Sequence, residues 1–168
     1  MLETFKNMVL PTKNKLFRFA FRILESHEEA EDVVQDVMIK MWDKRADLPK
    51  YQNVEAWCMR LTKNLSLDKL KSKHSQTHRQ NVEIDIASFS LNPDKELELN
   101  DTVSHIENMM NELPEKQKMV MQLRDIEGYS YQEIADVMEI SMSQVKVNLF
   151  RARDKVRQQL TKTNNYGI

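Results

Sequence analysis

The chain has 168 residues, 40% of them hydrophobic and 30% charged, and a formal net charge of −1. Only two glycines and four prolines, beside eleven methionines, favour an all-α protein of one medium domain or two small ones. No apolar run is long enough to cross a bilayer, and the first ten residues are too polar for a secretory signal. The single cysteine, Cys58, excludes an internal disulfide. We therefore expect a cytoplasmic protein that is not an integral membrane protein.

The near-neutral total conceals a strong charge pattern. Residues 1–49 carry eight basic and nine acidic side chains, and residues 50–80 carry seven and two. Residues 81–115 carry one basic side chain against nine acidic ones, and residues 116–168 carry nine against six. Two cationic segments are thus separated by an anionic one. This distribution is typical of a nucleic-acid binder that concentrates its positive charge.

The N-terminal third predicts helices. Residues 5–24 contain FRFAFRIL and are expected to form one helix. Ser26 and Glu29 have the spacing of a capping box, so we expect a second helix to begin there and to end near Leu48–Pro49. Its apolar residues recur every three or four positions: Ala30, Val33, Val34, Val37, Met38, Met41 and Trp42. That spacing predicts one continuous buried stripe.

A third helix is predicted from about Val54 to Lys71. From His74 to about Asp101 no apolar period persists, and Ser, Asn, Pro and acidic residues dominate. This stretch is typical of a flexible acidic linker. Helical periodicity resumes near Val103, breaks at Leu113–Pro114 and continues until Gly128, which is expected to cap the helix C-terminus.

The segment Tyr129–Leu160 predicts a helix-turn-helix. The expected turn is residues 140–143, with Ser143 as the N-cap of the second helix. The position before the turn, which is often glycine, is Glu139; a positive φ there would carry strain. The second helix has an apolar stripe of Val145, Leu149, Ala152, Val156 and Leu160.

Basic residues of this second helix lie mostly off its stripe. A helix packed on one side and cationic on the other fits a DNA major groove. The alternative is an ordinary helical hairpin with a solvated basic face. The spacing, the S-x-S turn and the Arg-x-Arg pair together favour DNA binding.

Three runs in this order resemble the sigma-70 family of bacterial RNA polymerase sigma factors, in its extracytoplasmic-function (ECF) group. They are AEDVVQDVMIKMW (30–42), EAWCMRLTKNLSLDKLK (55–71) and LPEKQKMVMQLRDIEGYSYQEIADVMEISMSQVKVNLFRARDKV (113–156). The resemblance implies two small helical domains, sigma region 2 at 1–75 and sigma region 4 at 104–168. A linker at 76–103 either spaces them or lies in the path that polymerase keeps for RNA.

The resemblance implies partners as well. Asp32, Gln35 and Asp36 match the surface that docks on the clamp helices of the polymerase β′ subunit, where carboxylates meet Arg and Lys. Without the resemblance, a plain solvated helix face would be the expectation. Further implied partners are the polymerase β flap, promoter DNA and an anti-sigma factor, which in some relatives holds the protein at the inner membrane.

Trp57, Arg60, Lys63 and Asn64 match the family positions that open and read the −10 promoter element. Melted DNA presents unstacked bases and phosphates, for which cations, an aromatic surface and a small amide are suitable ligands. Asn64 matches the position that contacts an extruded base. Trp57 has core packing as its alternative role, and we favour the core.

In the last domain, Lys146, Val147, Phe150 and Arg151 match positions that reach the −35 element, and Arg153 suits a phosphate. Phe150 is apolar yet off the stripe, which favours contact with a thymine methyl. Val147 departs from the small polar residue of many relatives, so the −35 sequence is not fixed by the resemblance.

Competing functions receive less support. No zinc-protease motif, glycine-rich phosphate loop or cysteine pair is present, so an enzyme, a small-molecule substrate, a cofactor or a bound metal is not expected. His74 and His78 are four residues apart, but without further ligands in the sequence nearby. A stand-alone helix-turn-helix regulator remains the alternative function. It would not need the acidic docking helix or the second basic segment.

Overall fold

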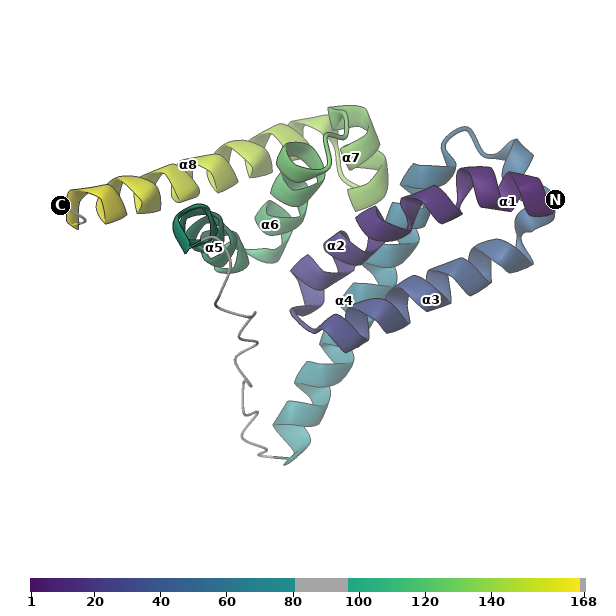
Figure 1. Cartoon of the computed structure of the whole chain (residues 1–168), viewed down its shortest axis with the longest axis horizontal. Helices are drawn as coiled ribbons and strands as arrows, with labels where there is room; N and C mark the ends of the chain where they lie inside the picture. The colour runs from purple at the N-terminus through teal and green to yellow at the C-terminus, as the bar shows by residue number, and fades with distance from the viewer. Residues whose placement is uncertain (81–96, 167–168) are drawn as a thin grey trace.

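The computed structural model describes residues 1–80 and 97–166, and the side chains of residues 1–75 and 102–163. The described residues form helices and no strand, which confirms the all-α prediction. Figure 1 shows two helical groups that meet where α7 lies beside α4. We call α1 to α4 the N-terminal domain and α5 to α8 the C-terminal domain.

The first predicted helix is interrupted. The chain forms α1 (Leu2–Met8), a 3₁₀ turn η1 (Leu10–Thr12) and α2 (Lys13–Leu24), so the expectation of one helix over residues 5–24 was wrong. Pro11 explains the break, because proline lacks an N–H and its ring clashes with the preceding turn. The Thr12 hydroxyl donates to the Val9 carbonyl at 2.6 Å and stabilises the bend.

Helix α3 (His27–Asp43) begins as predicted, because the Glu29 N–H donates to the Ser26 hydroxyl at 3.3 Å. It ends at Asp43, earlier than expected, and Leu48–Pro49 lie in the following turn η2 (Arg45–Lys50). The predicted stripe is the buried side of the helix; its fully buried members are Ala30, Val33, Val34, Val37 and Met41.

Helix α4 (Val54–Gln80) continues beyond the predicted end at Lys71, and α5 (Leu97–Asn111) begins before the predicted restart. The expected linker at 76–103 is therefore helical at both of its ends. Residues 81–96, where we expect the acidic flexible stretch, lie outside the described residues.

The C-terminal domain continues with α6 (Glu115–Met121), a π-helical turn η3 (Gln122–Ile126), α7 (Tyr131–Met138) and α8 (Met142–Tyr166). Gly128 has φ 78° directly after η3, as expected for a glycine that ends a helix. Helix α8 begins two residues earlier than predicted. Ser141, rather than Ser143, caps it: the Gln144 N–H donates to the Ser141 hydroxyl, and the Ser141 N–H donates to Gln144 Oε1, both at 3.1 Å.

One buried apolar cluster runs through both domains. It joins residues of α2, α3 and α4 to residues of α6, α7 and α8, among them Leu16, Phe19, Met59, Leu123, Ile134 and Leu149. A smaller cluster lies within the C-terminal domain, where α5 packs on α8: Met109, Leu113, Ala152 and Val156. The shared cluster holds the two domains together and fixes which helix faces remain exposed.

Candidate functional site

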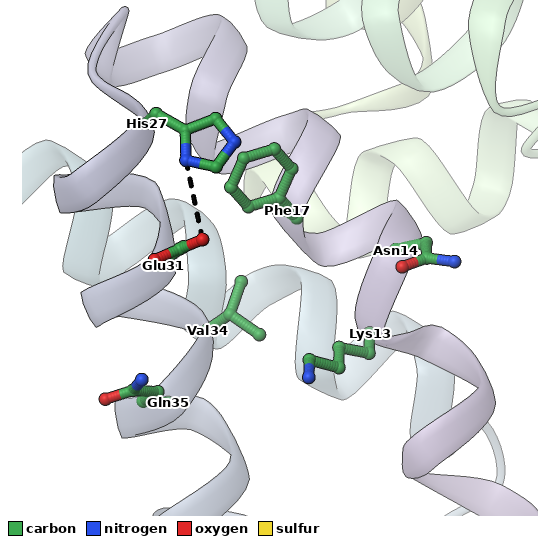
Figure 2. Close-up of a pocket in the computed structure, with 7 residues that line it drawn as sticks. All are labelled: Lys13, Asn14, Phe17, His27, Glu31, Val34 and Gln35. Carbon is green, nitrogen blue, oxygen red and sulfur yellow. Dashed lines mark ion pairs between the residues drawn. The ribbon is translucent and has the colours of Figure 1, made fainter.

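The outer face of α3 is acidic and open. Asp32, Gln35 and Asp36 are all exposed, on the side away from the buried stripe. A hollow of about 420 Å³ lies beside this face, between α2 and α3, and Phe17 and Gln35 are among the side chains that line it (Figure 2). Exposed carboxylates next to a partly apolar hollow can accept charge-assisted bonds from a partner and seat one of its side chains.

The exposed side of α4 carries an aromatic platform. Trp57 is half-buried and stacks on Tyr51, with ring centroids 5.4 Å apart. The Lys44 ammonium and the Arg60 guanidinium lie 5.8 and 5.7 Å from the Trp57 ring. Trp57 packs against the core cluster yet also lines a surface hollow of about 210 Å³. It therefore serves both as core and as a face on which a base could stack.

The neighbouring cations of α4 are covered by the other domain. Arg60 and Lys63 both donate to the carboxylate of Glu139, and the Lys63–Glu139 distance is 3.2 Å. The Lys63 side chain is only 5% exposed. These two bonds, with Arg60 the larger contribution, hold the pKa of Glu139 below its usual range. Asn64 is exposed on the same helix.

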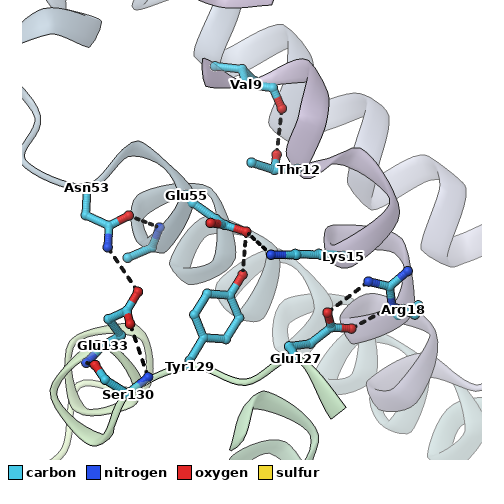
Figure 3. A network of polar contacts seen from close by, with 11 residues as sticks. Val9, Thr12, Lys15, Arg18, Asn53, Glu55, Glu127, Tyr129, Ser130 and Glu133 are labelled. Atoms are coloured by element: carbon cyan, nitrogen blue, oxygen red, sulfur yellow. Dashed lines mark hydrogen bonds and ion pairs between the residues drawn. The ribbon is translucent and has the colours of Figure 1, made fainter. Parts of the chain in front are cut away.

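Polar contacts between the domains continue along α2, which the sequence did not predict (Figure 3). Arg18 donates two bonds to Glu127, at 2.6 and 2.8 Å, and the Glu127 side chain is 2% exposed. Tyr129 donates to Glu55 at 2.9 Å, and Lys15 pairs with the same carboxylate at 2.9 Å. We call this set of contacts between α2 or α4 and residues 122–139 the seam.

The helix-turn-helix geometry follows from its caps. Ser130 and Glu133 form a reciprocal capping box at the start of α7. Glu139, at the position before the turn that is often glycine, ends α7 with φ 57° and ψ 44° and therefore has the left-handed conformation. The turn and the Ser141 cap then orient α8 so that Val145 and Leu149 are buried.

The outer face of α8 is open to solvent. Phe150 is 70% exposed and Val147 is 45% exposed, and Lys146 and Arg151 lie on the exposed surface beside them. An apolar ring flanked by cations can meet thymine methyl groups and phosphates in a major groove. Arg153 is held differently, because it donates two bonds to Asp125, at 3.1 and 2.5 Å.

Cys58, the single cysteine, is buried. Burial raises the pKa of the Cys58 thiol to about 12, so it is a core residue and not a nucleophile. No group of three potential metal ligands occurs among the described residues, and the side chain of His78 lies outside them. In the described part of the chain, no helix has the length and hydropathy needed to span a bilayer.

Comparison with known proteins gives two family matches along the chain. The family profile for sigma-70 region 2 matches residues 8–76, and the profile for sigma-70 region 4 matches residues 105–156. The ECF RNA polymerase sigma factor SigW of Bacillus subtilis (strain 168) is 25% identical over 170 residues, covering 94% of this chain and 89% of SigW. The RNA polymerase sigma-H factor of Pseudomonas aeruginosa is 24% identical over 163 residues, covering 92% and 84%.

Two solved structures share the fold. The sigma factor RpoE from Bartonella quintana, in complex with the anti-sigma factor NepR, superposes with a TM-score of 0.77 at 24% identity, covering 94% of this chain and 96% of that one. CnrH, in complex with the cytosolic domain of CnrY, superposes with a TM-score of 0.67 at 20% identity. With both sigma regions in order and relatives matched along nearly its whole length, the chain belongs to the sigma-70 family of RNA polymerase sigma factors, in the ECF group.

Proposed function

We propose that this sigma factor docks on core RNA polymerase through the outer face of α3 and reads promoters with two separate helix faces. The face of α4 with Trp57, Arg60, Lys63 and Asn64 receives the melted −10 strand. The face of α8 with Lys146, Val147, Phe150 and Arg151 reads the −35 duplex, while Arg153 braces α8 against Asp125 and adds a phosphate contact at its edge. The chain acts by binding, in the cytoplasm, and polymerase supplies the catalysis.

The observation that carries the docking role is the open acidic face of α3. Asp32, Gln35 and Asp36 are exposed together, while the stripe on the other side of the same helix is buried. A row of this kind offers oriented acceptors to Arg and Lys on a partner helix, and it lies beside the hollow with Phe17. The RpoE structure holds an anti-sigma factor. We propose that this chain, too, binds an anti-sigma factor.

The test is a double charge reversal, Asp32→Lys with Asp36→Lys. We expect binding to bacterial core polymerase to weaken by about 100-fold or more, because two attractions become repulsions at the centre of the interface. Folding should change little, since both side chains are exposed. The matched control is Glu3→Lys with Asp47→Lys, which changes the net charge equally at exposed sites of the same domain.

Transcription from promoter fragments with purified core polymerase supplies the second readout. The wild-type chain and the control pair should confer promoter-specific initiation, and the α3 variant should not. A stand-alone helix-turn-helix regulator would confer none in any form. Normal holoenzyme formation by the α3 variant would place the docking surface elsewhere.

A further inference from the structure

One side of α7 carries three carboxylates toward the N-terminal domain. Glu133 accepts a bond from Asn53 at 3.2 Å, and Asp136 lines the hollow that also contains Trp57 and Arg60. Glu139 accepts bonds from Arg60 and from Lys63. We call Glu133, Asp136 and Glu139 the acidic edge of α7. It lies on the same surface that the proposed function assigns to the −10 strand.

The backbone at Glu139 is unfavourable for its residue type. A left-handed conformation suits glycine, and a glutamate there is strained. The chain has a second case: Glu25 ends α2 with φ 54° and ψ 23°. No ion pair joins Glu25 to a described residue, whereas Glu139 meets two cations of the other domain. The two glutamates therefore separate the backbone effect from the charge effect.

The ion pair between Lys63 and Glu139 is important because Lys63 is buried. The Lys63 side chain is 5% exposed, and a lysine buried to that extent requires an anionic partner for its ammonium group; Glu139 is the carboxylate that meets it. If Glu139 leaves, Lys63 and Arg60 must return to water or to another anion. The anion with matching chemistry is a nucleic-acid phosphate, because Arg and Lys donate to phosphate oxygens as they do to carboxylates.

We propose that the acidic edge of α7 stands in for the −10 DNA strand when the two domains are closed. The inference rests on the proposed function, since it needs α4 to be the −10 reader. Strand and acidic edge cannot occupy Arg60 and Lys63 together, so reading the −10 element requires the seam to open between α4 and α7. By reciprocity, an anion that binds α4 favours the open chain, and any partner that separates the domains improves strand binding.

The experiment compares Glu139→Gln with the matched control Glu25→Gln in the full chain. Two dyes at Lys71→Cys and Lys155→Cys, both exposed positions of different domains, report the separation by energy transfer. Binding of a short, mixed-sequence, single-stranded oligonucleotide reports access to α4. We expect Glu139→Gln to lower energy transfer and to strengthen oligonucleotide binding by about threefold to tenfold, with Glu25→Gln unchanged in both assays.

A second variant tests whether unfolding, and not opening of the seam, lowers the energy transfer. Glu139→Gly removes the carboxylate and also relieves the left-handed strain, so the helix-turn-helix should be at least as stable as in wild type. It should open the seam as Glu139→Gln does. Unchanged energy transfer in both variants would overturn the proposal, and so would opening that leaves oligonucleotide binding unchanged.

The variant Arg60→Ala distinguishes failure of the mimicry proposal from failure of the proposed −10 role of α4. If Arg60→Ala weakens oligonucleotide binding while Glu139→Gln does not strengthen it, the −10 role stands and the mimicry is wrong. If Arg60→Ala leaves binding unchanged, the −10 role and the mimicry are both wrong.

Discussion

The two helix faces assigned to DNA differ in their surroundings. On α8, Phe150 is 70% exposed and Arg151 is open, so the face is ready for a partner. On α4, Lys63 is 5% exposed and Arg60 is paired, so the face is already occupied by Glu139. Both faces carry cations and an aromatic ring. The difference between them is set by the seam and not by local composition.

Whether a helix face is accessible to a partner therefore depends on the closed chain as a whole. Under the proposed function, a duplex would meet α8 without any rearrangement, whereas a single strand would have to compete with α7 for α4. We therefore expect duplex binding and single-strand binding to respond differently to the same conditions. Salt weakens both, but it also weakens the ion pairs that cover α4, so single-strand binding should fall less steeply.

The largest expected effect is on α8. Arg151→Ala should weaken binding to a −35 duplex by about 1–3 kcal/mol if the contact to a base is bidentate, because that bond is lost outright. Asn64→Ala should leave duplex binding nearly unchanged and impair binding of the single-stranded −10 segment. Fluorescence anisotropy with both probes measures the division, and Lys162→Ala, exposed farther along α8, is the control. Equal losses on both probes for Arg151→Ala and Asn64→Ala would contradict the division.

An effect of similar size, on folding stability and not on DNA binding, is expected within the seam. Arg18→Ala should lower the free energy of unfolding by about 1–3 kcal/mol, because the nearly buried Glu127 carboxylate then has lost both Arg18 bonds. Denaturant titration measures the change. Lys50→Ala is the comparison, since its pair with Asp47 is exposed and should contribute about 0–1 kcal/mol. A loss for Arg18→Ala no larger than for Lys50→Ala would mean that the seam contributes little stability.

The smallest expected effect is on the alkylation rate of Cys58, which should be the same in wild type and in Glu139→Gln. Cys58 lies in the core of the N-terminal domain, and burial raises its pKa to about 12, so at pH 8 its thiol should react with iodoacetamide far more slowly than an exposed cysteine. The same slow rate is expected in Glu139→Gln, because Cys58 is 0% exposed and also contacts Thr12 of its own domain. Mass spectrometry after timed quenching measures the rate. Fast labelling of Glu139→Gln alone would show local unfolding in place of domain separation.

Local features were predictable from the sequence where neighbouring residues determine them. The Ser26 cap and the buried stripe of α3 each depend on a few adjacent positions. The N-cap of α8 was misplaced by two residues because Ser141 and Ser143 both satisfy the residue preference, and Gln144 decides between them. The break at Pro11 was a local signal that the helical composition of residues 5–24 outweighed.

The seam could not be predicted in this way. Arg60 and Glu139 are 79 positions apart, and Arg18 and Glu127 are 109 apart, so no periodicity links them. The exposure of Asp32 and Phe150 followed from helical phase, whereas the burial of Lys63 depends on a helix of the other domain. The DNA and polymerase roles of these side chains stay predictions.

The long sequence distance across the seam has a consequence during synthesis. The ribosome must add 109 residues after Arg18 before Glu127 exists, which takes roughly 5–20 s at bacterial elongation rates. In the later part of that interval, from the completion of α4 at Gln80 until α7 (Tyr131–Met138) is made, the nascent N-terminal domain has no α7 to cover α4. A polymerase near the ribosome could capture the chain before it has closed for the first time.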